Sequence, residues 1–182
     1  MMKNVLLIAC LLSSTSYLMG QESLKIVWLE QYEWKLLSNN EDGRVHVIEI
    51  IPGKETAENW TMLGQMMSNK GVADLPMDQA KDLMFEQARA TAPDAQLTEV
   101  ERDEATEHPW ILFKIENPQL AEQEGTESQL WYIRQGKTAL YVNFIARKEA
   151  QLADEFVAEW SAVFKASEVV VLGEDGVEEG KD

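Results

Sequence analysis

The patterned part of the chain begins with two apolar segments separated by a polar turn. Residues 34–38 and 44–51 flank the sequence Asn39-Asn40-Glu41-Asp42-Gly43, and apolar side chains occupy both faces of the second segment. An Asp-Gly pair between such runs favours a tight turn joining antiparallel strands. The pattern predicts a β-hairpin lying centrally in a sheet, preceded by a short strand over residues 25–29 and stopped by Pro52-Gly53.

Two segments with a helical period follow this hairpin. The first runs from Thr56, a suitable N-cap, to about residue 69, before Gly71. The second spans residues 76–92 and stops at Pro93. Apolar residues recur every three or four positions, as an amphipathic helix requires: Trp60, Leu63 and Met67 in the first segment, and Ala80, Leu83, Met84 and Ala88 in the second. Two consecutive helices are predicted.

Strand-like alternation returns after residue 96. The predicted strands cover residues 97–102, 110–116, 129–135 and 138–147. A tight turn at Gly136-Lys137 joins the last two. The alternation along both strands is expected to group Leu130 and Tyr132 with Leu140, Val142 and Phe144, while Trp131 and Ile133 lie opposite Ala139, Tyr141 and Ile145. Apolar residues at helical spacing predict a final helix over residues 149–166, before a brief apolar run at 169–172.

The order of these elements indicates the fold class. Clusters of strands separated by helices, without strict alternation, are typical of an α+β fold. We expect one domain over residues 21–172, with an antiparallel β-sheet and helices packed on its faces. This length is sufficient for one hydrophobic core.

The first twenty residues have the three parts of a secretory signal. Lys3 provides the positive charge, residues 5–12 are apolar, and residues 13–16 are small and polar. The run is too short to span a bilayer, and cleavage after Ser16 or Gly20 is compatible with the pattern. Cys10 lies in a segment resembling a lipoprotein box, but only nine residues precede it, so a cleaved signal is favoured over lipidation. The expected location is periplasmic or secreted.

Composition narrows the possible partners and chemistry. The chain has 16 Lys and Arg against 32 Asp and Glu, a net charge of −16, which disfavours nucleic acid and anionic membranes and favours a cationic or neutral partner. Cys10 is the only cysteine, so cleavage leaves no disulfide, cysteine nucleophile or thiolate metal site. The glycine-rich acidic tail, residues 173–182, is predicted to be disordered.

Candidate reactive groups each have a plainer structural explanation. His46 and His108 are far apart and lack metal-ligand spacing. Glu99, Glu101 and Asp103 alternate along one strand and could form a calcium or glycosidase site, but such rows are more often solvated faces. Five methionines, at helical spacing, fit core packing better than copper binding: Met62, Met66, Met67, Met77 and Met84. We expect no catalytic residue, metal or cofactor.

The six tryptophans offer the remaining candidate site. At least four of them are expected in the core because they lie on apolar stripes: the six are Trp28, Trp34, Trp60, Trp110, Trp131 and Trp160. The sequence Asn59-Trp60-Thr61 is a glycosylation sequon, but a role in anchoring the local backbone is favoured. A ligand pocket between the sheet and the helices would be lined by Trp60, Met67 and Trp131.

One family resemblance rests on particular segments. The strand Val47–Ile51 leads into Pro52-Gly53-Lys54-Glu55-Thr56 and Glu58-Asn59-Trp60-Thr61, and a tryptophan-bearing helix covers Glu155–Lys165. Over about residues 25–170 the chain resembles the exported DcrB-like proteins, which are related in fold to the photosystem protein PsbP. The resemblance implies an antiparallel sheet sandwiched between helices. Bacterial members are mostly uncharacterised periplasmic proteins or lipoproteins without a known active site.

These observations lead to two functional expectations. The first is an exported, non-enzymatic protein that binds another protein or an envelope component and does not insert stably in a membrane once its signal is cleaved. The alternative is a small-ligand-binding protein with a pocket between sheet and helices. A hydrolase using the acidic row at residues 99–103 ranks well below both.

Overall fold

The protein is built from nine strands, two α-helices and one 3-10 turn in the parts that the computed structural model describes, residues 21–118 and 126–172. The predicted signal and acidic tail lie outside these residues. The elements are β1 (Gln21–Lys25), η1 (Glu30–Tyr32), β2 (Lys35–Asp42), β3 (Val45–Ile51), β4 (Met62–Lys70), α1 (Met77–Thr91), β5 (Gln96–Asp103), β6 (Trp110–Glu116), β7 (Ser128–Gln135), β8 (Ala139–Arg147), α2 (Asp154–Lys165) and β9 (Glu168–Leu172).

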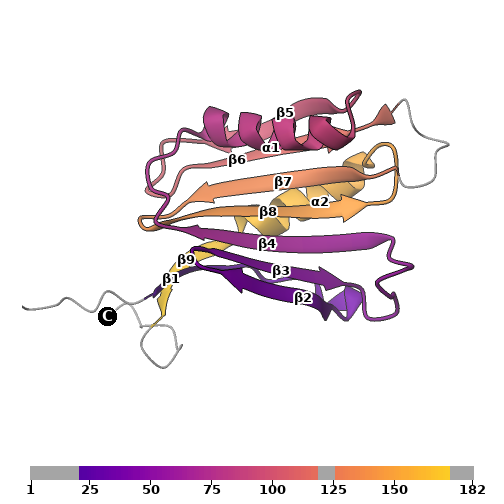
Figure 1. Cartoon of the computed structure of the whole chain (residues 1–182), viewed down its shortest axis with the longest axis horizontal. Helices are drawn as coiled ribbons and strands as arrows, with labels where there is room; N and C mark the ends of the chain where they lie inside the picture. The colour runs from indigo at the N-terminus through magenta and orange to yellow at the C-terminus, as the bar shows by residue number, and fades with distance from the viewer. Residues whose placement is uncertain (1–20, 119–125, 173–182) are drawn as a thin grey trace, which may run out of the picture.

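Seven of these strands form one antiparallel sheet in the order β2-β3-β4-β8-β7-β6-β5. The remaining two, β1 and β9, pair antiparallel as a separate ribbon. Figure 1 shows α1 in front of β5 and β6, and α2 on the other side of the sheet behind β7 and β8. The expected α+β class, with an antiparallel sheet and helices packed against it, is confirmed.

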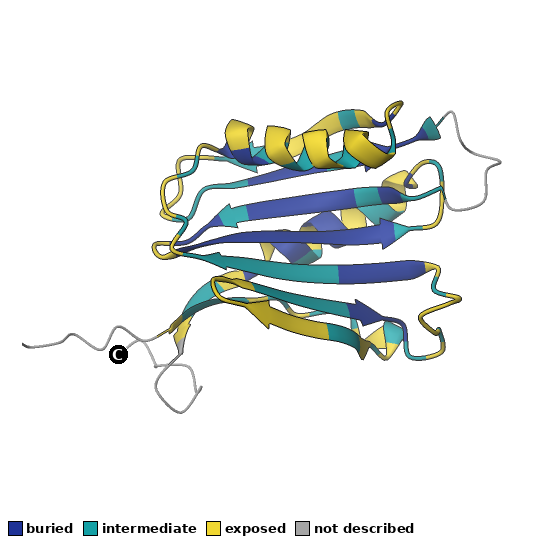
Figure 2. Cartoon of the chain, viewed as in Figure 1, coloured by how far each residue is buried: buried dark blue, intermediate teal, exposed yellow. Residues whose placement is uncertain are grey.

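Each face of the large sheet carries its own hydrophobic core because the central strands alternate apolar residues to both sides. On the α1 face, Met77 and Ala80 of the helix pack over Phe113, Ile133 and neighbouring residues. On the α2 face, Trp160 and Phe164 pack over Leu112 and Tyr132, and all four side chains are fully buried. Figure 2 shows the resulting buried band across β6, β7 and β8 and the exposed outer surface of α1.

The segment predicted as the first helix is a strand instead. Residues 62–70 form β4, which pairs with β3 on one side and β8 on the other. Leu63 and Met67, four positions apart, share a face in a helix and in a strand, so their spacing fits both. Because β4 is central, Met62 is buried on the opposite face, which removes the alternation that normally marks a strand.

The loop before β4 explains why Thr56 caps no helix. The carboxylate of Glu55 accepts hydrogen bonds from the backbone N–H of Thr61 (2.7 Å) and of Met62 (3.3 Å), which fixes the entry of the chain into the strand. Gly71 does terminate the element, with a φ of 79° that favours glycine, but the element it ends is a strand.

The other predicted elements are present, with four corrections. The hairpin β2–β3 lies at one edge of the sheet, not at its centre. The preceding strand covers Gln21–Lys25, earlier than expected, and α2 begins only at Asp154. Leu83 of α1, expected to face the core, is 43% exposed.

The turn between β7 and β8 is displaced by one residue. The N–H of Gly136 donates to the carbonyl oxygen of Ala139 (2.8 Å), so the turn is centred on Lys137 and Thr138. Moving a two-residue turn by one position changes each cross-strand partner by two residues and leaves every side chain on its own face. Trp131 is therefore opposite Phe144, and Ile133 is opposite Val142, contrary to the predicted pairing. With either turn, Trp131 and Ile133 share a face with Leu140, Val142 and Phe144, so the predicted division of faces is wrong.

Candidate functional site

A groove of about 590 Å³ lies between α1 and the α1 face of the sheet. Its floor contains Met67 of β4, Phe144 of β8 and Trp131 of β7. Strand register builds this floor, because Gln65, Phe144, Trp131 and Phe113 form one row across four neighbouring strands. The displaced turn is what brings Trp131 into this row.

Aromatic stacking makes the floor rigid. The ring of Trp131 lies 4.7 Å from that of Phe144, centroid to centroid, and is stacked on Phe113 at 6.0 Å with an interplanar angle of 5°. Such pairs stabilise a fold beyond the area that they bury. The floor is therefore a preformed apolar surface, which small-molecule sites usually provide.

The wall of the groove is the C-terminal half of α1. Met84 and Ala88 provide its apolar part and Gln87 and Thr91 its polar part. The helix contacts β6 and β7, and Figure 1 shows no helix over the same face of β4. The groove is therefore open on the β4 side and closed on the α1 side.

A chain of polar groups begins at one end of the groove. The indole N–H of Trp131 donates to Oε1 of Gln129 (2.8 Å), and the amide nitrogen of Gln129 donates to Oε1 of Glu127 (2.6 Å). Burial raises the pKa of Glu127 above its usual value, and the Gln129 hydrogen bond and the charge of Lys148 oppose that shift only in part. A carboxyl group with a raised pKa beside an apolar floor is typical of functional sites.

Asn117 adds a second polar group to the groove lining. It is only 4% exposed, and its Oδ1 has no hydrogen-bond partner. Leaving a buried acceptor unpaired costs about 1–3 kcal/mol. Such a group needs an explanation, and its place in the lining of a groove suggests that a bound molecule satisfies it.

Glu116, the adjacent acidic residue of the lining, has structural partners. Its Oε1 accepts a hydrogen bond from the backbone N–H of Leu152 (2.8 Å), and its Oε2 pairs with Lys114 (2.9 Å). These contacts tie the end of β6 to the segment before α2. Glu127 is therefore the lining carboxylate best placed to meet a ligand.

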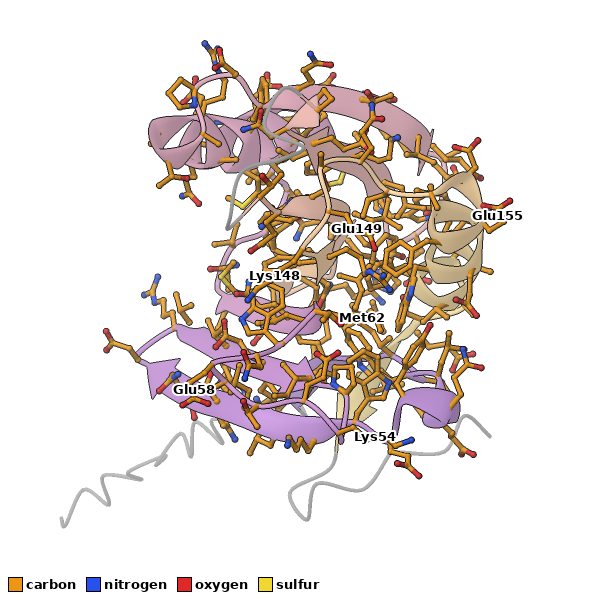
Figure 3. The ribbon with its side chains drawn as sticks, turned by 90° about the vertical axis from the view of Figure 1, so that its right-hand side faces the viewer. Lys54, Glu58, Met62, Lys148, Glu149 and Glu155 are labelled. Atoms are coloured by element: carbon orange, nitrogen blue, oxygen red, sulfur yellow. The ribbon has the colours of Figure 1, made fainter. Side chains whose placement is uncertain are left out.

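The three sequence-predicted ligand residues are only partly brought together. Met67 and Trp131 both line the groove, as the pocket hypothesis required, whereas Trp60 does not. Trp60 packs at the margin of the same core, and the ammonium of Lys148 lies 4.4 Å from the centroid of its ring. Figure 3 shows Lys148 and Glu149 at this end of the sheet, with Glu155 on the outer side of α2.

Sequence reasoning missed the polar residues of the groove. Asn117 follows β6 and Glu127 precedes β7, so no period distinguishes them from ordinary loop residues, and Gln129 is an ordinary polar position of β7. Trp131, Gln129 and Glu127 do alternate at period two, which was the one available signal that the three side chains share a face.

The acidic row predicted on one face of β5 is divided by a β-bulge. The register shifts between Glu99 and Glu101, so Glu99 lies opposite Phe113 whereas Glu101 lies opposite Leu112. Glu99 pairs with Lys81 of α1 (3.2 Å), and Glu101 pairs with Lys165 of α2 (2.8 Å). The expectation that these acids and Asp103 share one side is wrong, because a bulge reverses the alternation.

The histidines and methionines are also dispersed. Nε2 of His46 lies 2.7 Å from Oδ1 of Asn39, and Nδ1 of His108 lies 3.2 Å from the carbonyl oxygen of Gln135. Met62 and Met67 belong to cores on opposite faces of the sheet. Among residues 21–118 and 126–172, no group of three or more His, Cys, Asp or Glu side chains is placed to hold a metal ion.

The tryptophans pack against the two cores. Trp131 and Trp160 are buried, and the other four are partly buried against one core or the other. On the α2 face, Trp28 and Trp34 contact Trp160, with ring centroids 5.5 and 5.8 Å from it. Neither helix of the described chain is long and apolar enough to cross a membrane.

Comparison with known proteins assigns no family to this α+β protein, which has a groove on one face of its sheet. No protein-family model matches the chain, and no curated sequence matches it.

Proposed function

We propose that the protein binds a small amphipathic molecule in the groove between α1 and the sheet. The observation that carries this proposal is the combination of a preformed aromatic floor with the unpaired acceptor of Asn117 and the half-buried carboxyl group of Glu127. Small-molecule sites combine a concave, mostly apolar surface with a few converging polar groups, and this groove falls within their usual range of volume. We propose binding without catalysis, since the sequence carries no motif typical of a nucleophile activated by a base.

Binding of a protein or envelope component is the second candidate. The observation that favours it is the edge strand β2, where Leu36 is 61% exposed. However, β2 also carries a bulge between Leu36 and Ser38, and Glu41 and Asp42 charge its far end. Bulges and edge charges protect a sheet from adding another strand, so this edge supports a partner less well than the groove supports a ligand.

The cellular setting belongs to the same proposal. The signal-like leader supports export to the periplasm or beyond, and the net charge of −16 supports a partner other than nucleic acid. The DcrB-like and PsbP-like resemblance, with its sandwich of sheet and helices, is kept as a proposal that agrees with α1 and α2 lying on opposite sides of the sheet.

Filling the groove tests the proposal. Ala88→Phe adds a ring to the groove wall, whereas Ala158→Phe adds the same ring to an exposed position of α2. The full chain and both variants are titrated with the neutral fluorophore N-phenyl-1-naphthylamine. We expect Ala88→Phe to weaken binding about tenfold or more and Ala158→Phe to leave it unchanged.

Thr91→Phe, at an exposed position of the groove rim, repeats the test if Ala88→Phe unfolds the protein. The proposal is wrong if the folded protein does not bind the fluorophore, or if a folded groove variant binds it as well as the wild type does.

A further inference from the structure

The charged side chains that line the groove are all acidic among the described residues. Among the described residues that line it, two are glutamates and none is lysine, arginine or histidine. Asn117 presents an unpaired acceptor, Oδ1, and Glu127 accepts one hydrogen bond from Gln129. A carboxylate has room for about four hydrogen bonds. Beside the amide and hydroxyl groups of its other polar residues, the groove therefore offers a charged and a neutral acceptor to a ligand head that brings donors.

Lys148, the cation whose charge acts on Glu127, is engaged beside the groove. The Nζ of Lys148 is 4.4 Å from the ring centroid of Trp60, and its charge reaches Glu127 without entering the lining. Glu127 thus keeps a partly buried carboxyl group whose charge is incompletely balanced. A buried carboxylate gains most from a partner that is both positively charged and able to donate hydrogen bonds.

The floor suits the rest of such a ligand. Met67, Phe144 and Trp131 form an apolar surface next to Glu127 and Gln129, and the faces of aromatic rings attract cations as well as apolar chains. The excess of acidic over basic residues in the whole chain adds a field that attracts cations and repels anions.

We propose that the ligand is a cationic amphiphile with a hydrogen-bond-donating head, such as a primary ammonium. Glu127 and Asn117 receive the head, and Met67, Phe144 and Trp131 hold the apolar body. This inference rests on the proposed function of the groove and adds the chemical class of its ligand.

Three probes with one six-carbon chain test the head group: hexylammonium, 1-hexanol and hexanoate. Each is titrated into the full chain at pH 7, and binding is followed by calorimetry and by the amide NMR shifts of Gln129 and Trp131. We expect hexylammonium to bind at least about tenfold more tightly than hexanol, because charge-assisted hydrogen bonds exceed neutral ones by that factor. We expect hexanoate to bind most weakly.

Two variants test whether Glu127 and Asn117 cause the tighter binding of hexylammonium. Glu127→Gln keeps the shape of the side chain and removes its charge. We expect this variant to bind hexylammonium with an affinity within about threefold of its affinity for hexanol. Glu86→Gln removes the same charge from an exposed position of α1 and serves as the matched control. Asn117→Leu removes the unpaired acceptor and is expected to weaken the binding of hexylammonium more than that of hexanol.

The outcomes separate this inference from the function on which it rests. If all three probes bind equally and shift the groove amides, the groove binds ligands but the inference about the head group is overturned. If hexanoate binds best, or if Glu127→Gln retains the full preference, the inference is likewise overturned. If no probe binds and the fluorophore also fails to bind, the proposed function itself is contradicted.

Discussion

Glu127 lines the groove at a cost to the stability of the fold. It is half-buried beside apolar groups, and burial raises its pKa. The folded protein therefore holds the proton more tightly than the unfolded chain does, so stability falls as the pH rises through the pKa of Glu127. Residues that reduce stability in a groove are often kept for function.

This cost leads to a pH-dependent prediction. At pH 7, Glu127→Gln should raise the free energy of unfolding, because a neutral amide avoids the burial of charge. The difference from the wild type should shrink as the pH falls below the ordinary glutamate pKa of about 4.3, where both side chains are neutral in the unfolded chain. Urea denaturation at several pH values measures it. A gain no larger than that of the exposed control Glu86→Gln would contradict the account.

Gly64 is a second residue with a specific requirement. A Cβ placed on it would lie 2.5 Å from Cζ3 of Trp28, so the indole packs directly on the backbone of β4. We predict that Gly64→Ala destabilises the protein by about 1–3 kcal/mol, the usual cost of overpacking a core. In a Trp28→Leu background the added methyl group finds more room, so its cost should be smaller. Urea unfolding of the wild type, the two single variants and the double variant measures the cost of Gly64→Ala in each background. An equal cost in the two backgrounds would exclude the contact with Trp28 as the cause.

At the scale of single residues, the sequence predicted two of the apolar side chains that line the groove. Met67 and Trp131 were identified because large apolar residues lie on periodic stripes. Glu127 and Asn117 were not identified, because what distinguishes them is burial and missing partners. Those properties depend on neighbours distant in the chain, such as Lys148 and α1, and no local pattern records them.

At the scale of elements, the errors arose where two periods coincide or where the alternation is interrupted. β4 was taken for a helix because Leu63 and Met67 are four residues apart, a spacing common to both structures. The β5 bulge put Glu99 on the opposite face from Glu101, and the shifted β7–β8 turn changed the partner of Trp131 from Val142 to Phe144. Strands β2, β3, β6, β7 and β8 and the helices α1 and α2 were predictable because their apolar periods are unambiguous, whereas the leading strand β1 lies earlier than predicted.

The β1–β9 ribbon is joined to the large sheet through Glu22. Its Oε2 accepts a hydrogen bond from the backbone N–H of Lys137 (2.9 Å), and its Oε1 accepts one from the hydroxyl of Tyr141 (3.2 Å). A Cβ on Gly136 would collide with this carboxylate, so close approach explains the glycine. The turn between β7 and β8 and the β1–β9 ribbon therefore pack closely against each other through Glu22.

This junction gives a prediction for Tyr141. Burial, followed by the charge of Glu22, raises the pKa of its hydroxyl group, because both disfavour the phenolate. Glu22→Gln removes the charge and should lower the pKa of Tyr141, though burial keeps it above the ordinary value. Phenolate absorbance during alkaline titration measures the change. Tyr132, whose pKa is raised chiefly by burial, is the internal control, and an unchanged Tyr141 would contradict the assignment.

At the scale of the whole molecule, the sheet separates two different surfaces. The α2 face is filled by aromatic residues, including Trp28, Trp34 and Trp160, and stabilises the fold. The α1 face is covered over β6 and β7 and leaves a groove toward β4. The general sheet-and-helix arrangement could be predicted from element order. The uneven covering could not, because it follows from β4 being a strand and from the absence of the helix expected in its place.

The most direct test of this account is NMR of the full chain labelled with ¹³C at the methionine methyl groups, titrated with N-phenyl-1-naphthylamine. Met67 and Met84 line the groove, whereas Met62 and Met66 do not. The aromatic probe should shift the methyl signals of Met67 and Met84 in a saturable manner and leave those of Met62 and Met66 unchanged. Saturable shifts confined to Met62 and Met66, or no saturable shift at any methionine, would contradict the claim that the groove is the binding site.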